Sequence, residues 1–170
     1  MSNKRVSLIL LGLGLFLLVL GLGYAFYLQR EESVSPAPLP WELGGQPLSR
    51  AITGPTALTE LSWMHGKEFQ LNQGAVGSYG RDGEITIYVA GTPLKYMTGR
   101  LLTAMRDKID EVNSPFSPIA EREIDQRMIY ELEGMGQRHF YFRSDDLIVW
   151  LAVDNSYAEE ALQEILIFYP

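Results

Sequence analysis

The segment LIVWLAV at residues 147–153 decides the fold, because a strand formed there is apolar on both faces. Side chains alternate between the two faces of a strand, and a face without polar side chains has to be covered. We therefore expect this strand near the middle of a sheet. A helix should cover one face, and either residues 29–56 or the first segment of the domain should cover the other.

The residues before this segment predict the rest of the sheet. A three-stranded meander is expected from strands at about residues 122–133 and 137–143, together with the segment above. Turn-forming glycine and aspartate residues separate these strands. An earlier hairpin is expected from residues 74–79 and 85–89, which flank the glycine-containing turn Gly80-Arg81-Asp82-Gly83. Before this hairpin, residues 58–65 fit either a strand or a helical segment.

Two helices are expected to pack on this sheet. Thr92 suits an N-cap and Pro93 the first helical position, and apolar residues then recur at spacings of three and four up to Ile109. Ser156 and Glu159 form a capping box that opens a last helix. The order ββ-α-βββ-α predicts an α+β fold for residues 57–170, with a small antiparallel sheet packed with two helices.

Residues 29–56 differ in composition from the domain that follows them. The alternating prolines of PAPLP favour an extended polyproline II backbone, and Gly44-Gly45 adds a flexible pair. This region is therefore predicted to be a stalk. Its prolines are Pro36, Pro38, Pro40, Pro47 and Pro55.

Residues 6–28 form a run of 23 residues without a charged side chain. A helix of this length spans about 34 Å, enough to cross a hydrocarbon core about 30 Å thick. Lys4 and Arg5 precede the run, so the positive-inside rule places residues 1–5 in the cytoplasm. We expect a signal-anchor in the cell membrane, with the C-terminal domain outside the cytoplasm in the cell envelope.

A cleaved secretory signal is the alternative interpretation of this run. Gly21-Leu22-Gly23 and Gly23-Tyr24-Ala25 are its candidate cleavage sites. The apolar core of a secretory signal is normally about 7–15 residues long, which is shorter than this run. The aromatic residues near its end are typical of a membrane interface, and this favours retention.

Four small residues, Ser7, Gly14, Gly21 and Ala25, lie on one stripe of the predicted membrane helix. Small side chains let a second helix approach closely, so the stripe predicts an oligomer, or pairing with another membrane protein, through this helix. Glycine is also frequent in membrane helices generally, and the alternative is a stripe without a partner.

Charge and composition restrict the partners of the domain. Three of the 14 Lys and Arg residues precede residue 31, which leaves 11 against all 21 Asp and Glu and a formal charge of −10 for residues 31–170. This charge repels phosphates, so nucleic-acid binding is not expected. The absence of cysteine excludes disulfides and thiolate chemistry. The expected partners are the lipid bilayer and a cationic or neutral envelope or membrane protein.

No residues have the spacing of a catalytic, cofactor-binding or metal site, and we expect none. The two histidines are His65, expected in a turn, and His139. For His139 to act as a base, Asp145 or Asp146 across the next turn would have to orient it. The aspartates of that turn lack the oxygen spacing of a calcium loop.

Aromatic side chains are concentrated between Tyr130 and Trp150, on consecutive predicted strands. One face of these strands should belong to the core, and the other is suited to a partner or a small apolar ligand. We expect Tyr88, Tyr141 and Arg143 to be exposed members of this partner surface.

Together these features predict a single-pass, non-enzymatic binding or scaffolding module, for example an accessory subunit of a membrane complex. Two other classes stay open. One is a membrane-tethered, hydrolase-like enzyme that uses His139 with carboxylates, and an acid beside this histidine would favour it. The other is a domain that binds a small ligand between sheet and helix, which an aromatic-lined cavity would favour.

Replacing Gly14 and Gly21 with leucine should abolish association through the predicted stripe, because the larger side chains keep a second helix away. The measurement is self- or hetero-association of the full chain in membranes. The same replacements at Gly12 and Gly23, on the opposite side of the helix, should leave association intact. Unchanged association of the Gly14 and Gly21 variant would contradict the stripe.

Overall fold

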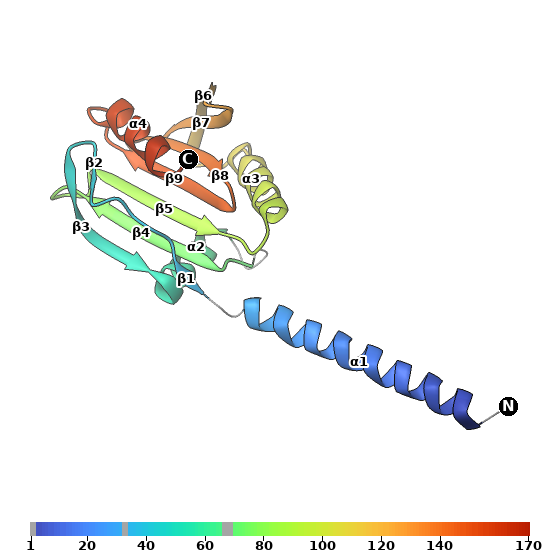
Figure 1. The fold of residues 1–170 in the computed structure, drawn as a ribbon. Helices are drawn as coiled ribbons and strands as arrows, with labels where there is room; N and C mark the ends of the chain where they lie inside the picture. Colours follow the sequence, from blue (N-terminus) through green and yellow to red (C-terminus); the bar gives the residue numbers. More distant parts are fainter. Residues whose placement is uncertain (1–2, 32–33, 66–69) are drawn as a thin grey trace. The chain divides into compact units, whose positions relative to one another are not determined.

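The computed structural model describes residues 3–31, 34–65 and 70–170, and the side-chain surroundings of residues 9–26, 34–62 and 70–170. The chain divides into two compact units, Met1–Ser33 and Val34–Pro170 (Figure 1).

The first unit contains one helix, α1 (Asn3–Glu31). Its segment Ile9–Phe26 has a mean hydropathy of 2.4 and is long and apolar enough to cross a membrane. A signal sequence near an N-terminus meets the same criteria, so α1 has the length and composition of a membrane anchor or of a signal sequence. A Cβ added at Gly14 or Gly21 would meet no atom within 4 Å, so the small-residue stripe is open at these positions. The side chain of Ser7 lies outside the described residues.

The second unit is an α+β domain built on a nine-stranded sheet, which confirms the predicted class. The strands are β1 (Ser35–Pro36), β2 (Glu42–Leu43), β3 (Gln46–Thr53), β4 (Gln73–Tyr79), β5 (Ile85–Gly91), β6 (Phe116–Ile124), β7 (Arg127–Gly134), β8 (Gln137–Ser144) and β9 (Leu147–Val153). They are arranged in the order β2-β3-β4-β5-β9-β8-β7-β6, with antiparallel neighbours throughout. Strand β1 pairs in parallel with β4.

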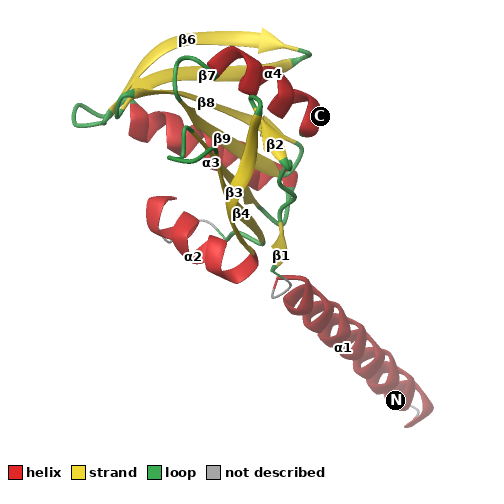
Figure 2. Ribbon diagram, turned by 90° about the vertical axis from the view of Figure 1, so that its left-hand side faces the viewer, coloured by secondary structure: helices red, strands yellow, loops and turns green. Residues whose placement is uncertain are grey.

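Strand β9 lies between β5 and β8, as its apolar sequence predicts. Val149, Leu151 and Val153 pack on the side of helix α4 (Ala158–Phe168). Ile148 and Trp150 pack on the opposite side, against helix α3 (Lys95–Ile109). Helix α2 (Gly54–His65) covers β4 and β5 on that same side, so helices flank the sheet on both faces (Figure 2). Residues 58–65 are thus helical rather than extended.

The predicted stalk is wrong for residues 34–53, which belong to the sheet and to the core under α4. Ala37 and Leu43 are buried in that core. The Tyr79 hydroxyl donates a hydrogen bond to the carbonyl of Pro40 at 2.9 Å, and the Tyr169 hydroxyl donates to that of Pro38. Proline spacing favours an extended backbone, but it does not indicate whether the side chains between the prolines reach a core.

The strand predicted at residues 122–133 is wrong, because the chain reverses in the middle of it. Asp125 and Gln126 have φ of 50° and 64°, the left-handed conformation at both central positions of a two-residue hairpin turn. The meander therefore has four strands, and β6 forms one end of the sheet. The turn lacks the glycine that usually marks such a reversal, and Asp125 is its only residue of a type common in turns.

Both predicted N-caps are wrong. Helix α3 has Leu94 at its N-cap without a side-chain cap, and the buried Thr92 hydroxyl instead donates to the Leu94 carbonyl at 3.0 Å. Helix α4 has Tyr157 at its N-cap, also without a side-chain cap. Glu159 does not close a capping box because its carboxylate is held by arginines of the sheet.

Replacing Gln126 with glycine should raise the free energy of unfolding by about 0.5–1 kcal/mol, since glycine adopts the left-handed conformation without strain. Gln126→Val should lower it, because a β-branched side chain is the least compatible with positive φ. Chemical unfolding of the full chain in detergent compares the two variants. Equal stability of both would contradict a strained turn.

Candidate functional site

Four aromatic side chains form a row across four neighbouring strands. Tyr88 lies opposite Trp150, Trp150 opposite Tyr141, and Tyr141 opposite Tyr130. The rings of Trp150 and Tyr141 stack with centroids 5.2 Å apart, and those of Tyr141 and Tyr130 with centroids 4.8 Å apart. The Arg106 guanidinium carbon lies 4.8 Å from the centroid of the Tyr130 ring. The predicted aromatic face therefore exists, and α2 and α3 cover it.

The three residues expected on an exposed partner surface have different surroundings. Tyr141 is only 2% exposed, so its predicted exposure is wrong, because α3 packs over its strand. Tyr88 is half-buried beside α2, and burial together with the charge of Glu60 raises its pKa. Arg143 is exposed as expected. The partner surface predicted from these three residues is therefore not a single exposed patch.

His139 is 4% exposed, and both of its ring nitrogens have hydrogen-bond partners. Trp150 Nε1 donates to Nδ1 at 3.1 Å, and Nε2 lies 3.0 Å from the Gly134 carbonyl oxygen. These contacts fit the neutral ring with its proton on Nε2. Burial lowers the pKa of His139 and outweighs the opposite effect of the Gly134 carbonyl.

The predicted pairing of this histidine with an acid is not formed. Asp145 pairs with Lys95 at 2.6 Å, and Asp146 accepts from Gln73 Nε2 at 3.5 Å. The other histidine, His65, is the last residue of α2, and its side chain lies outside the described residues.

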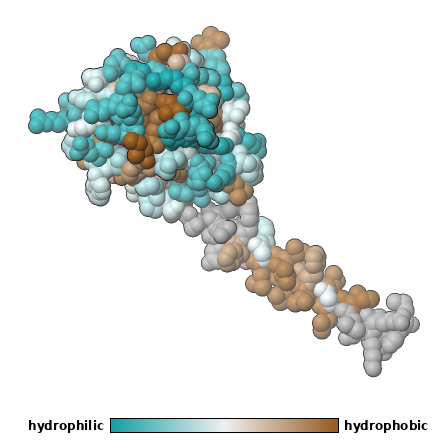
Figure 3. Space-filling model, turned by 45° about the horizontal axis from the view of Figure 1, so that its top comes forward, coloured by the Kyte–Doolittle hydropathy of each residue, from teal (hydrophilic) through white to brown (hydrophobic). Residues whose placement is uncertain are grey.

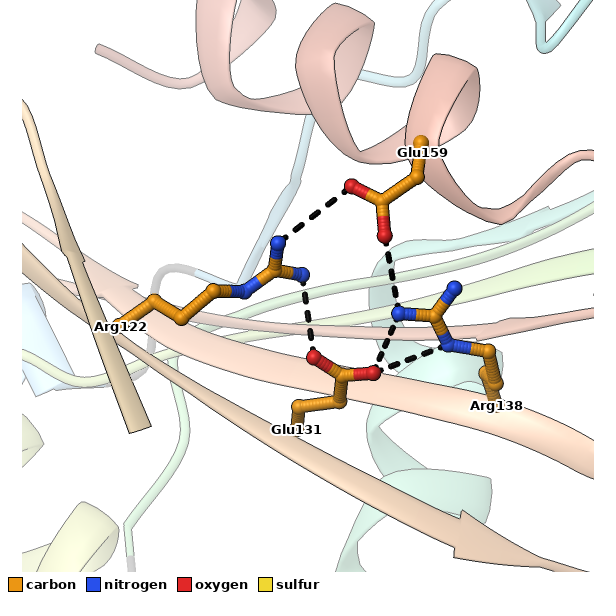
Figure 4. Close-up of polar contacts among 4 residues, drawn as sticks. All are labelled: Arg122, Glu131, Arg138 and Glu159. Carbon is orange, nitrogen blue, oxygen red and sulfur yellow. Dashed lines mark hydrogen bonds and ion pairs between the residues drawn. The ribbon is translucent and has the colours of Figure 1, made fainter. Parts of the chain in front are cut away.

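A network of four charged side chains lies on the α4 side of the sheet (Figure 4). The Glu131 carboxylate is 7% exposed and accepts from Arg138 Nε at 2.9 Å. Its other oxygen lies 3.1 Å from Arg122 Nη2. Glu159 completes the ring, 2.9 Å from Arg138 and 3.4 Å from Arg122. Each carboxylate thus contacts both guanidinium groups, which compensates charges that burial would otherwise destabilise.

This network and one further arginine attach both ends of α4 to the meander. Burial would raise the pKa of Glu159, but hydrogen bonds and attraction from Arg138 and Arg122 outweigh this effect and hold the pKa below its usual value. At the other end of the helix, Arg127 Nη2 donates to the Leu166 carbonyl at 3.0 Å, and Nη1 donates to that of Tyr169. A cation is favourable there because helix C-terminal carbonyls are unpaired and carry partial negative charge.

An open groove of about 970 Å³ lies between α4 and the β6–β7 hairpin. Its apolar lining residues are Ile124, Leu162, Leu166, Ile167 and Pro170, and Ile167 is 81% exposed. Figure 3, which turns this side of the domain toward the viewer, shows an apolar patch enclosed by hydrophilic side chains. We call this feature the α4 groove.

The rim of the α4 groove is locally less acidic than the domain. It has four cationic residues, Lys95, Arg122, Arg127 and Arg143, and three acidic ones, Asp125, Asp145 and Glu159. Most of these groups are engaged in the contacts described above. In the described part of the chain, the side chains of Arg143 and Asp125 have no hydrogen bond or ion pair and remain available to a partner.

Sequence reasoning missed the α4 groove and the charged network because both depend on the unrecognised turn. With a reversal at Asp125 and Gln126, Arg122 and Glu131 come onto neighbouring strands and the same face. The turn has no glycine, and Asp125 alone, a residue type that tolerates the left-handed conformation, was too weak a signal to predict it.

No group of three or more His, Cys, Asp or Glu side chains is placed to hold a metal ion among the residues that the structure describes. Comparison with protein-family models, with curated proteins and with solved structures finds no match for this chain. The site is therefore interpreted from its own geometry.

The stability of the domain should fall as the pH decreases below about 6.5, the ordinary pKa of histidine. His139 has a lowered pKa when folded, so the unfolded chain binds a proton that the folded chain still excludes. His139→Gln should weaken this pH dependence, while His65→Gln should retain it. The free energy of unfolding of the full chain, measured between pH 5 and pH 8, distinguishes the two variants. Equal pH dependence of both would contradict a buried neutral His139.

Proposed function

We propose that this chain is a single-pass, membrane-anchored binding module without enzymatic activity. Helix α1 stays in the membrane with the N-terminus in the cytoplasm, and the α+β domain binds another envelope or membrane protein outside the cytoplasm. The length and apolar composition of α1 support the anchor, and Lys4 and Arg5 support the orientation. Oligomerisation through Ser7, Gly14, Gly21 and Ala25 stays a prediction.

The observation that carries this proposal is the α4 groove. Protein-binding sites combine an apolar centre with a polar, solvent-accessible rim, and the α4 groove has both. Its volume of about 970 Å³ accommodates several side chains of a partner. Ile167 is an apolar side chain in a position where the domain itself leaves it uncovered.

The charges of the rim specify the chemistry of the partner segment. Arg143 attracts an acidic side chain, and Asp125 attracts a basic one, because neither charge is compensated within the described residues. We therefore propose that the partner presents an apolar segment flanked by one acidic and one basic residue. Such a segment is close to neutral overall, which suits a domain whose residues 34–170 carry a formal charge of −8.

The surroundings of His139 support a non-enzymatic role. Both of its ring nitrogens are engaged, and neither contacts a carboxylate. A general base needs a free lone pair within reach of a substrate. This histidine holds the Trp150 ring and the end of β7 in place instead.

Photocrosslinking from the α4 groove tests the proposal in native membranes. Because the chain has no cysteine, Ile167→Cys provides a unique attachment point for a membrane-impermeant benzophenone maleimide. We expect labelling in intact cells and an adduct whose crosslinked peptide contains apolar, acidic and basic residues. Arg143→Glu in this background should lower the adduct yield at least about tenfold, as expected for loss of a charged contact at an interface.

Two matched variants serve as controls. Val112→Cys introduces the same probe at a fully exposed apolar residue outside the groove and should give no such adduct. Arg100→Glu makes the same charge change at an exposed position of α3 and should leave the Ile167 adduct intact. Labelling only after cell lysis would contradict the orientation. An adduct with a second copy of this chain, or one insensitive to Arg143→Glu, would contradict the proposed partner.

A further inference from the structure

A second hollow lies on the opposite side of the sheet from the α4 groove, between the C-terminal half of α3 and strands β6–β8. It has a volume of about 290 Å³. Ile109 of α3, Leu132 of β7 and Ile119 of β6 contribute apolar lining, while Tyr130, Tyr141 and Arg106 form a polar and aromatic wall. We call it the α3 pocket.

The aromatic wall of the α3 pocket is rigid. Tyr141 is stacked between Trp150 and Tyr130, with interplanar angles of 13° and 17°. Arg106 covers the Tyr130 ring and donates a hydrogen bond from Nη1 to its hydroxyl at 3.3 Å. A flat group that enters the pocket therefore meets side chains that are already held in position, which lowers the entropic cost of binding.

The Tyr141 hydroxyl has no protein partner in this pocket. No hydrogen bond joins it to another residue in the part of the chain that the structure describes, and it is not among the fully buried unpaired atoms of that part. Its hydrogen is therefore available to a group that enters the pocket. The Tyr130 hydroxyl accepts from Arg106, so its own hydrogen is also available. Two phenolic donors thus lie at one wall of the pocket, and Ile109, Ile119 and Leu132 form its apolar part.

The charges around the pocket restrict the ligand further. Asp110 and Glu121 also line it, and Glu121 accepts from Arg106 Nη2 at 3.2 Å. Glu131 also lines the pocket, but its carboxylate is paired with Arg122 and Arg138. The remaining cation and two carboxylates give a formal charge of −1 at this site. A carboxylate ligand would be repelled, whereas an uncharged oxygen acceptor would not.

We propose that the α3 pocket binds a small, uncharged, planar molecule whose carbonyl oxygen accepts a hydrogen bond from Tyr141. The planar body of the molecule packs against Ile109, Ile119 and Leu132. The volume of the pocket is at the lower end of the range for small-molecule sites, so the ligand is of the size of a single substituted aromatic ring. This site is separate from the α4 groove and does not depend on the partner proposed there.

Benzamide is a suitable probe, and benzoate is its matched anion. We propose titrating each into the full chain in lipid nanodiscs and following the ring resonances of isotopically labelled tyrosines. Benzamide should shift the Tyr130 and Tyr141 signals in a saturable way, and benzoate should bind at least about tenfold more weakly because of the two carboxylates.

Tyr141→Phe separates binding from folding. It removes a hydroxyl that the fold leaves unpaired, so the free energy of unfolding should not decrease, whereas benzamide affinity should fall about tenfold, as expected for one hydrogen bond. Tyr88→Phe makes the same change in the same aromatic row but outside the pocket, and it should leave the affinity unchanged.

Three results would overturn the proposal: no saturable shift of Tyr130 or Tyr141 with benzamide, equal affinity for benzoate, or a Tyr141→Phe variant that binds benzamide as the wild type does. Ile167→Asp, in the α4 groove, should leave benzamide binding intact. The outcome is therefore independent of the partner-binding experiment.

Discussion

Burial of β9 on both faces is the constraint on which the domain depends. Each fully buried aliphatic side chain stabilises the fold by about 1.5–3 kcal/mol relative to exposure, and β9 places such side chains alternately on opposite sides of the sheet. One set of these side chains packs against α4 and residues 34–43, and the other set packs against α3. Because β9 also aligns β5 and β8, its register fixes the aromatic row and, through β8 and β7, the position of the charged network.

The α+β class, the central place of β9, the first hairpin and the two amphipathic helices follow from local patterns, and the structure bears them out. The segregation of Phe140 and Phe142 from Tyr141 onto opposite faces follows from strand alternation in the same way. The failures have non-local causes. Residues 34–43 accept hydrogen bonds from the distant Tyr79 and Tyr169. Glu159 forms ion pairs with arginines of the sheet instead of capping its helix.

The site was less predictable than the fold, because it depends on how elements that are distant in the sequence pack against each other. Aromatic density located the row correctly, but exposure of Tyr141 depends on where α3 crosses the sheet, which periodicity does not determine. The net charge of the domain likewise gave no information about the rim of the α4 groove, where cations gather beside acidic partners. Local composition predicts which side chains share a strand face. Binding depends on which of these side chains stay exposed after the helices have packed on the sheet.

The position of β6 at the end of the sheet has a consequence for self-association. A second copy that paired with this strand antiparallel about Arg122 would place Glu121 opposite Glu123 twice, and like charges directly opposite each other are destabilising. Pro118 has no N–H to donate, and the register shifts between Pro118 and Ala120. The strand is thereby protected against continuous fibre-like stacking, even where many copies of the domain are crowded together.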